Sequence, residues 1–333
     1  MRWRGLGLAL GLVSTMALAG QVVDDKGRTV TVPDQPRHIA DAWFAHHALL
    51  MTLGAGDRIV ATVNHTQRQP WMFTVQPSLN QALTVDGTAF NVESLLAAKV
   101  DLVFASTGDR HALAYEQAGI AVVYMGFNDL PGLKHSLLTS AQALGSPEAL
   151  ARAQAYDAYL DQQVETIRQR LQGLPAEQRP RVLHIASLKP LKVDGAGTLI
   201  DDWIGLAGGR NAATGLTGNL QVVNAEQVLA WQPDVVILAA DAGSLDQVPL
   251  LKQLHAVTSG HLLRNPAGVF PWDRYGTEIA LQLPWAAQQL HPALFQNVQM
   301  GPLTQAFYQR FFDYPLTAGQ AASILQGDGP AGP

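Results

Sequence analysis

Apolar and polar residues follow two spacings along this chain. Short apolar runs end in turn residues, and most are followed by a segment with apolar positions three or four residues apart. The first pattern is typical of a buried strand and the second of an amphipathic helix. In the first half the strand-like runs lie at residues 37–41, 58–63, 101–105 and 121–125. Strands that alternate with helices in this way predict a parallel sheet covered by helices.

The same alternation restarts in the second half of the chain. Strands are expected at residues 181–186 and 234–239, helices at 201–206 and 303–312, and a further apolar segment lies at residues 269–270. The chain ends in the Gly/Pro-rich segment 327–333, which we expect to be disordered.

Two hairpins are expected beside these units. The stretch VVDDKGRTVTVP at residues 22–33 alternates on either side of Lys26 and Gly27, which favours a tight turn. A second hairpin is expected around KVDGAGTLI at residues 192–200.

A single long helix is predicted between the two halves. Ser146 is a suitable N-cap, Pro147 occupies the first helical position and Glu148 lies in the first turn. Apolar residues then recur at helical spacing until Gly173 and Pro175 end the segment. Such a helix is about 39 Å long, enough to cross a domain and join two lobes as a stiff rod.

The length of the chain also favours two lobes, because 333 residues are more than one core usually organises. We therefore divide the chain into a signal peptide, an N-terminal lobe, a linking helix, a C-terminal lobe and a tail. Their predicted bounds are 1–19, 20–145, 146–173, 174–326 and 327–333.

One unit of sequence occurs twice, once in each half. NVESLLAAKVDLVFAS at residues 91–106 returns as NAEQVLAWQPDVVILAA at residues 224–240. Each copy reads as an Asn N-cap, an acid in the first turn, a short helix and a buried strand. This repeat on both sides of a rigid helix predicts two Rossmann-like α/β lobes that face each other across a ligand cleft.

The N-terminus has the features of a secretory signal. Arg2 and Arg4 precede an apolar run, and Ala17 to Ala19 form a small-residue cleavage site. A transmembrane anchor is the alternative, but the run is shorter than the roughly 20 residues that span a bilayer. The sequence has no cysteine, which excludes a lipoprotein anchor and disulfides. These features predict a freely diffusing protein of the periplasm.

Composition and missing motifs exclude several function classes. Lys and Arg total 22 against 27 acids and form no basic stripe, which argues against nucleic acid as a partner. The first predicted strand is not followed by G-x-G-x-x-G, and the chain has no G-x-S-x-G, so an enzyme is disfavoured. We expect no intrinsic cofactor.

The loops that follow the predicted strands carry aromatic, cationic and imidazole side chains. Arginines and lysine in such loops can neutralise an anionic ligand, and aromatic rings can stack on its organic part. The candidate ligand-binding residues are Trp43, His46, His47, His65, Arg68, Trp71, Arg110, Lys189, Trp272, Arg274 and Tyr275. His65 and Tyr275 are also candidate metal ligands. The commoner alternative is a histidine that only makes structural hydrogen bonds, which we expect for His184.

The order of motifs resembles the periplasmic substrate-binding proteins of ABC importers for metal chelates, a family that carries iron–siderophores, haem and cobalamin. The repeat contributes to this likeness. So do VVDDKGRTVTVPDQPRHIA at residues 22–40, LGAGDRIVAT at 53–62, GLAGGRNAA at 205–213 and LPWAAQQLHPALF at 283–295.

The resemblance implies a protein that captures a metal chelate, foremost an iron–siderophore, and delivers it to an inner-membrane permease with its ATPase. It implies that Glu93 and Glu226 dock on the permease; the alternative is that both acids only compensate a helix dipole. Family members commonly have a Glu where AHHALLMTLG has His47, so the ligand stays open between an iron–siderophore, haem, cobalamin and a nickel–histidine chelate. A molybdate or tungstate binder on the same scaffold is a further alternative, which the tryptophans disfavour. We expect a monomer.

Overall fold

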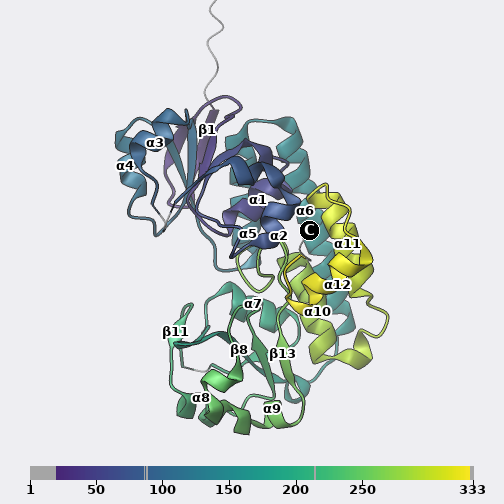
Figure 1. Ribbon diagram of the computed structural model, residues 1–333. Coiled ribbons are helices and arrows are strands. Elements are labelled where there is room, and N and C mark those ends of the chain that lie inside the picture. The colour runs from purple at the N-terminus through teal and green to yellow at the C-terminus, as the bar shows by residue number, and fades with distance from the viewer. Residues whose placement is uncertain (1–19, 86, 88, 214, 331–333) are drawn as a thin grey trace, which may run out of the picture.

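The computed structural model describes residues 20–330, apart from positions 86, 88 and 214. The predicted signal peptide lies outside the described residues. Two α/β lobes lie one above the other, and a layer of helices joins them along one side (Figure 1). The predicted fold class, two Rossmann-like lobes with parallel strands joined by a long helix, is confirmed.

The N-terminal lobe is built on a five-stranded parallel sheet. Its strands, in spatial order, are β5 (Leu83–Thr84), β4 (Ile59–Thr62), β3 (Ile39–Asp41), β6 (Leu102–Ser106) and β7 (Ala121–Met125). The four strands predicted in this half are therefore confirmed. The predicted first hairpin is also confirmed, with β1 (Gly20–Val23) antiparallel to β2 (Thr29–Val32). The helices are α1 (His46–Thr52), α2 (Pro70–Val75), α3 (Val92–Ala97), α4 (Ala112–Gln117) and α5 (Leu130–Leu144).

The C-terminal lobe has a mixed sheet in the order β11-β9-β8-β12-β13, with β10 beside β8. Its strands are β8 (Arg181–Leu188), β9 (Leu191–Val193), β10 (Arg210–Asn211), β11 (Gln221–Val222), β12 (Val235–Leu238) and β13 (Leu262–Arg264). The helices are α7 (Leu199–Leu206), α8 (Ala225–Trp231), α9 (His255–Thr258), α10 (Ile279–Leu290), α11 (Met300–Phe311) and α12 (Ala318–Gln326).

One prediction for this lobe is wrong. The hairpin turns at Lys189 and Pro190, between β8 and β9, so the segment 192–200 instead leads into α7. Residues 269–270 do not form a strand, because their backbone N–H groups donate to side chains instead of to a neighbouring strand. Val269 N donates to the Tyr308 hydroxyl at 3.0 Å, and Phe270 N donates to the buried carboxylate of Glu278.

The repeated unit builds the same local structure in both lobes. Asn91 caps α3 by accepting from Ser94 N, and Asn224 caps α8 by accepting from Gln227 N. At the other end of each unit an aspartate accepts a hydrogen bond from the backbone at the start of the neighbouring strand. Asp101 accepts from Arg37 N at 3.0 Å before β3. Asp234 accepts from Arg181 N at 2.7 Å, where β8 begins.

The linking helix is α6 (Pro147–Arg170), and Ser146 caps it by accepting from Ala149 N. Its apolar side is buried in a core that reaches both lobes, from Phe104 in the first sheet through Tyr156 to Ile237 in the second. Figure 1 shows α10, α11 and α12 packed beside α6 between the lobes. The long helix therefore lies inside a shared core rather than between two separate ones.

Hydrogen bonds also connect α1, α6 and the segment before α10. The Tyr156 hydroxyl donates to Thr277 O at 2.7 Å, and the Thr52 and Thr277 hydroxyls lie 2.8 Å apart. Arg152 Nε donates to Thr52 O at 2.8 Å. Tyr156, Thr52 and Thr277 are fully buried, so their polar groups need these partners within the protein.

The predicted disorder of the tail is wrong for its first residues. Gly327 ends α12 in the left-handed conformation, and Asp328 N donates to Ser323 O at 2.9 Å. Asp328 O accepts from Trp71 Nε1 at 2.8 Å, which ties this segment to α2 of the other lobe. Residues 331–333 lie outside the described part. Among the described helices, none combines the length and the apolar character needed to cross a membrane.

Replacing Tyr156 with Phe should lower the free energy of unfolding by about 1–2 kcal/mol, because Thr277 O loses its buried donor. Urea unfolding monitored by circular dichroism measures the loss. Tyr159 lies one turn further along α6, and its buried hydroxyl has no hydrogen-bond partner among the described residues. Tyr159→Phe should therefore cost nothing. Equal losses in the two variants would contradict the assigned role of the Tyr156 hydroxyl.

Candidate functional site

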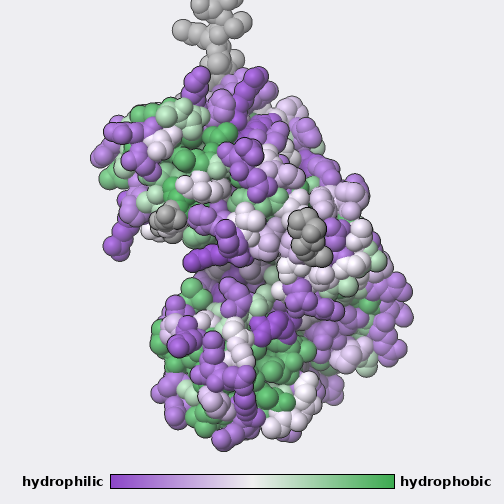
Figure 2. All heavy atoms as spheres, viewed as in Figure 1, coloured by the Kyte–Doolittle hydropathy of each residue, from purple (hydrophilic) through white to green (hydrophobic). Residues whose placement is uncertain are grey.

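A cavity of about 730 Å³ lies between the lobes, at the carboxyl ends of the strands. Figure 2 shows the surface hollowed between them. This volume is in the range of pockets that hold small molecules and cofactors. The N-terminal lobe contributes Trp43, Phe44, Ala45, Asn64, His65, Gln67, Arg68 and Gln69 to the lining. The C-terminal lobe contributes Ala186, Asn219, Leu220, Ala239, Asp241, Phe270, Pro271, Asp273, Arg274 and Tyr275.

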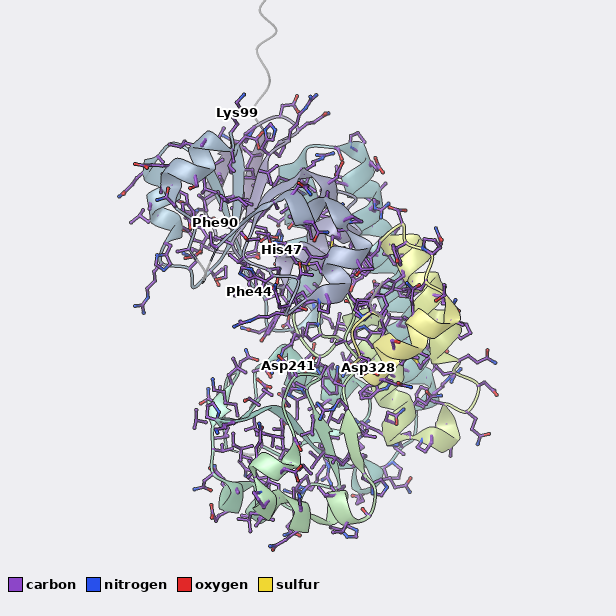
Figure 3. All side chains as sticks on the ribbon, in the orientation of Figure 1. Phe44, His47, Phe90, Lys99, Asp241 and Asp328 are labelled. Atoms are coloured by element: carbon purple, nitrogen blue, oxygen red, sulfur yellow. The ribbon has the colours of Figure 1, made fainter. Side chains whose placement is uncertain are left out.

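Buried polar groups hold the loops of the N-terminal wall in place. Asp41, at the end of β3, accepts from Trp43 N at 3.1 Å. Asn64 Nδ2 donates to Phe44 O at 2.9 Å, which connects the loops after β3 and β4. His65 Nε2 donates to Val85 O at 2.8 Å. Phe44 faces the C-terminal lobe (Figure 3).

The C-terminal wall rests on a network of four charged side chains. His184 is fully buried, with Nδ1 2.9 Å from Asp194 Oδ2 and Nε2 2.6 Å from Asp273 Oδ2. Arg274 Nη1 donates to Asp194 Oδ1 at 3.1 Å. Asp194 also accepts from Leu220 N at 2.9 Å, so the network holds two of the lining loops.

The network keeps its charges because each one faces a partner. Burial opposes a charged His184, but its hydrogen bonds to Asp194 and Asp273 hold the histidine pKa above its usual value of 6.5. The pKa of Asp194 is likewise held well below its usual range despite burial, by hydrogen bonding to His184 and by the charges of His184 and Arg274. Two cations and two carboxylates therefore balance beneath this wall.

Glu278 fixes the back of the same loop. Its carboxylate accepts from Trp272 Nε1 at 2.9 Å, from Phe270 N at 2.7 Å and from the Tyr308 hydroxyl. Complete burial raises the pKa of Glu278 to about 7 in spite of these donors. The loop that presents Phe270, Asp273, Arg274 and Tyr275 is thus anchored from behind.

An aromatic cluster crosses from one lobe to the other beside the cavity. The Tyr275 ring lies 6.3 Å from Trp43 and 5.4 Å from Phe127, and the latter two rings are 5.5 Å apart. The Tyr275 hydroxyl accepts from Asn219 Nδ2. A second hollow of about 520 Å³ shares Trp43, Asn219 and Tyr275 with the cavity, so the cleft continues past the cluster.

The structure brings five of the predicted ligand-binding residues together. Trp43, His65 and Arg68 line the cavity from the N-terminal lobe, and Arg274 and Tyr275 line it from the C-terminal lobe. Both candidate metal ligands are among them. Across the described ranges, no three His, Cys, Asp or Glu side chains are placed to hold a metal ion.

Four other candidates lie in the core, which corrects their proposed contact with a ligand. Trp71 and Trp272 are buried and donate to Asp328 O and Glu278. His46 is buried between Asp41 and Ser140, and His47 Nε2 lies 2.7 Å from the Thr62 hydroxyl. Burial lowers the pKa of His47, which favours the neutral imidazole. His46 and His47 lie in α1 and Trp71 lies in α2, and these side chains make their hydrogen bonds within the protein core.

The remaining candidates are exposed. Arg110 and Lys189 do not line the cavity, so the structure does not bring them to this site. Glu93 and Glu226 are exposed in the first turns of α3 and α8. Figure 1 shows α3 and α8 on the side of the molecule opposite the helical layer, one in each lobe.

Sequence reasoning missed several lining residues. Phe44 and Asn64 lie in loops that it selected, and the aromatic or amide side chain was the available signal. Asp241 comes just after β12, so the rule that ligands bind at strand ends would have found it. Asn219 follows no predicted strand, and nothing in its local sequence marks it.

Replacing His184 with Gln should destabilise the protein by about 3 kcal/mol, because Asp194 and Asp273 lose their charged partner in the interior. A raised histidine pKa stabilises the fold fully below the usual value of 6.5, and the contribution falls as pH rises through the folded-state value. Urea unfolding from pH 5.5 to 9 should therefore show the gap between wild type and variant narrowing with increasing pH. His255→Gln is the control, since His255 is exposed and none of the hydrogen bonds and ion pairs found among the described residues involves its imidazole; a gap for His184→Gln that does not change with pH would mean that His184 is neutral.

The chain is similar to proteins of known ligand. The molybdate-binding protein MolA of Haemophilus influenzae is 26% identical over 91% of this chain and 94% of its own length. The structure of MolA with bound molybdate matches with a TM-score of 0.77 and 21% identity, over 89% of this chain and 99% of that one.

Two further structures share the fold at lower identity. CeuE of Helicobacter pylori with bound Ni(II) matches with a TM-score of 0.75 and 18% identity, over 92% of this chain and 99% of that one. The haem-binding protein RhuT of Roseiflexus sp. RS-1 has a TM-score of 0.62 and 19% identity, over 78% and 99%. The model of the periplasmic binding protein family matches residues 45–267. The chain therefore belongs to the periplasmic binding proteins, a family of solute-binding transport proteins that deliver their ligands to an ABC permease.

Proposed function

We propose that this chain is the periplasmic solute-binding component of an ABC importer and that its ligand is a metal chelate. The observation that carries the proposal is the cavity between the lobes, which has aromatic side chains and an arginine on each wall. Trp43 and Arg68 come from one lobe, and Phe270, Arg274 and Tyr275 come from the other. Aromatic faces match the organic part of a chelate, and the guanidinium groups match its anionic oxygens.

The two arginines differ in what they can offer. Arg274 already bonds Asp194, so its charge is largely balanced within the protein. Arg68 is exposed, and no hydrogen bond or ion pair of its guanidinium is found within the described part of the chain. Arg68 is therefore the group that we assign to an anionic oxygen of the ligand, with His65 and Tyr275 as candidate ligands to the metal itself.

Within this class the sequence resemblance favours an iron–siderophore, and haem, cobalamin and nickel–histidine complexes are alternatives of similar chemistry. A molybdate or tungstate oxyanion is the second candidate, supported by the 26% identity to MolA. An oxyanion needs hydrogen-bond donors and has no surface on which Trp43, Phe270 or Tyr275 could stack. The aromatic walls are therefore the reason to place the chelate first.

Capture would proceed by a small rotation of the lobes around the ligand. The lobes share one core along α6, so large bending would expose apolar surface that is now buried. The contact of Tyr275 with Trp43 and Phe127 crosses between the lobes and would guide the closing motion.

Titration of the purified protein should distinguish the two ligand classes. We expect ferric siderophores or another chelate of the panel to bind with a dissociation constant of micromolar or below, and molybdate and tungstate to bind at least about a hundredfold more weakly. Isothermal calorimetry measures both, and mass spectrometry of protein from its native periplasm identifies any ligand that co-purifies. Tight binding of molybdate with no binding of any chelate would overturn the chelate proposal.

We further propose that Glu93 and Glu226 dock on the permease. Replacing both with Ala should abolish uptake of the ligand by cells and leave its affinity for the purified protein unchanged. Glu148 is an exposed first-turn acid of α6, so Glu148→Ala is the matched control for the loss of a favourable helix-dipole interaction. Unchanged uptake in the double variant, or an equal loss in the control, would contradict the docking role.

A further inference from the structure

The two walls of the cavity carry opposite charges that form no ion pair among the described residues. Arg68 lies on the N-terminal wall, and Asp241 lies on the C-terminal wall just after β12. Asp241 is exposed, and its carboxylate has no hydrogen bond or ion pair within the residues that the structure describes. Figure 3 shows Asp241 at the edge of the C-terminal lobe that faces Phe44. The cleft therefore offers an acid opposite the cation already assigned to the ligand.

Asp241 lies on a loop whose backbone carbonyls are held in place by hydrogen bonds. Arg264 Nη1 donates to Ala240 O at 2.8 Å, and its Nη2 donates to Gly243 O at 2.9 Å. Leu188 N donates to Ala242 O at 2.8 Å, which ties the loop to β8. Arg264 thus uses its donors on the loop carbonyls, and the Asp241 carboxylate is left for a partner in the cavity.

A second acceptor on the same wall points to the same kind of partner. Asp273 is fully buried and also lines the cavity. His184 occupies its Oδ2 at 2.6 Å, whereas Oδ1 has no hydrogen-bond partner among the described residues. A buried acceptor without a donor is unfavourable, so a ligand donor that reached Oδ1 as the lobes close would relieve this cost.

We propose that Asp241 recognises a cationic or hydrogen-bond-donating group of the chelate, such as a pendant ammonium, while Arg68 binds its anionic side. This inference rests on the proposed function, because it takes the ligand to be a chelate with an organic periphery. It narrows the substrate class to chelates that carry a donor group on one side. A bare oxyanion at neutral pH presents only acceptors, so the Asp241 carboxylate would repel it.

A matched pair of probes tests the proposal. Ferrioxamine B is a ferric trihydroxamate with a pendant ammonium, and its hydroxamate oxygens are the acceptors that Arg68 would contact. Acetylation of its amine removes the ammonium charge without changing the iron centre. We expect wild-type protein to prefer the ammonium form by about tenfold or more, since a hydrogen bond to a charged partner is worth roughly one to two powers of ten in affinity. Asp241→Asn should lose about ten- to one-hundredfold in affinity for the ammonium form and stay within about twofold for the acetylated form.

Two further variants make the result specific to this side chain. Asp241→Glu keeps the charge and should retain most of the preference for the ammonium form. Glu177→Gln removes an exposed acid that does not line the cavity and should leave both affinities unchanged. Calorimetric titration measures every affinity, and circular dichroism confirms that the variants are folded.

Titration results other than the expected ones would each contradict a specific statement made above. If Asp241→Asn lowers the affinity for both forms equally, Asp241 acts by pairing with Arg68 when the lobes close and does not recognise the ammonium group of the ligand. Equal affinity of wild-type protein for both forms would also contradict the inference, and it would leave the proposed function intact. If wild-type protein binds neither form nor any other chelate and binds molybdate, then the proposed function itself is wrong.

Discussion

The geometry of the cleft depends on one apolar core that continues from the first lobe to the second. α6 runs through this core, and Tyr156 and Leu160 on its buried side have almost no exposed surface. Separating the lobes would expose this surface to water, which is the main free-energy cost that opposes unfolding. The core therefore holds the two lobes together on the side of the molecule opposite the cleft.

The loops that line the cleft are held by buried carboxylates. Asp41 bonds the backbone before α1, Asp194 bonds Leu220 N and Arg274, and Glu278 bonds the backbone of the loop after β13. Burying a carboxylate is costly unless donors surround it, and each of these groups has its donors within the protein. The cavity walls are thus formed before a ligand arrives, which lowers the entropy lost on binding.

The regular elements could be predicted from the sequence because their signals are local. Apolar runs gave the central strands, and Ser146 with Pro147 marked the start of α6. Parallel strands place their carboxyl ends at one edge of a sheet, so the loops that contain His65 and Arg68 could be assigned to the cleft. The direction of each side chain within a loop could not be predicted from the sequence, because it depends on backbone turns that have no fixed period.

The loop after β13 illustrates this limit. Asp273, Arg274 and Tyr275 line the cavity, but the adjacent Trp272 points inward to Glu278. Trp71 was misassigned for a different reason, since its partner Asp328 lies 257 positions away in the chain. Contacts of this range follow from packing of the whole fold, and no pattern near either residue predicts them.

Under the proposed function, opposite charges on the two walls would also couple closure to the chemistry of the ligand. In the open cleft water solvates Arg68 and Asp241, which are both exposed. Closing the lobes would remove part of this water, and an unpaired charge in a narrowed cleft is unfavourable. A ligand that pairs only one wall leaves the other charge uncompensated, whereas a chelate with an anionic side and a donor side satisfies both. The closed state, which the permease would receive, is then favoured most by ligands that match both walls.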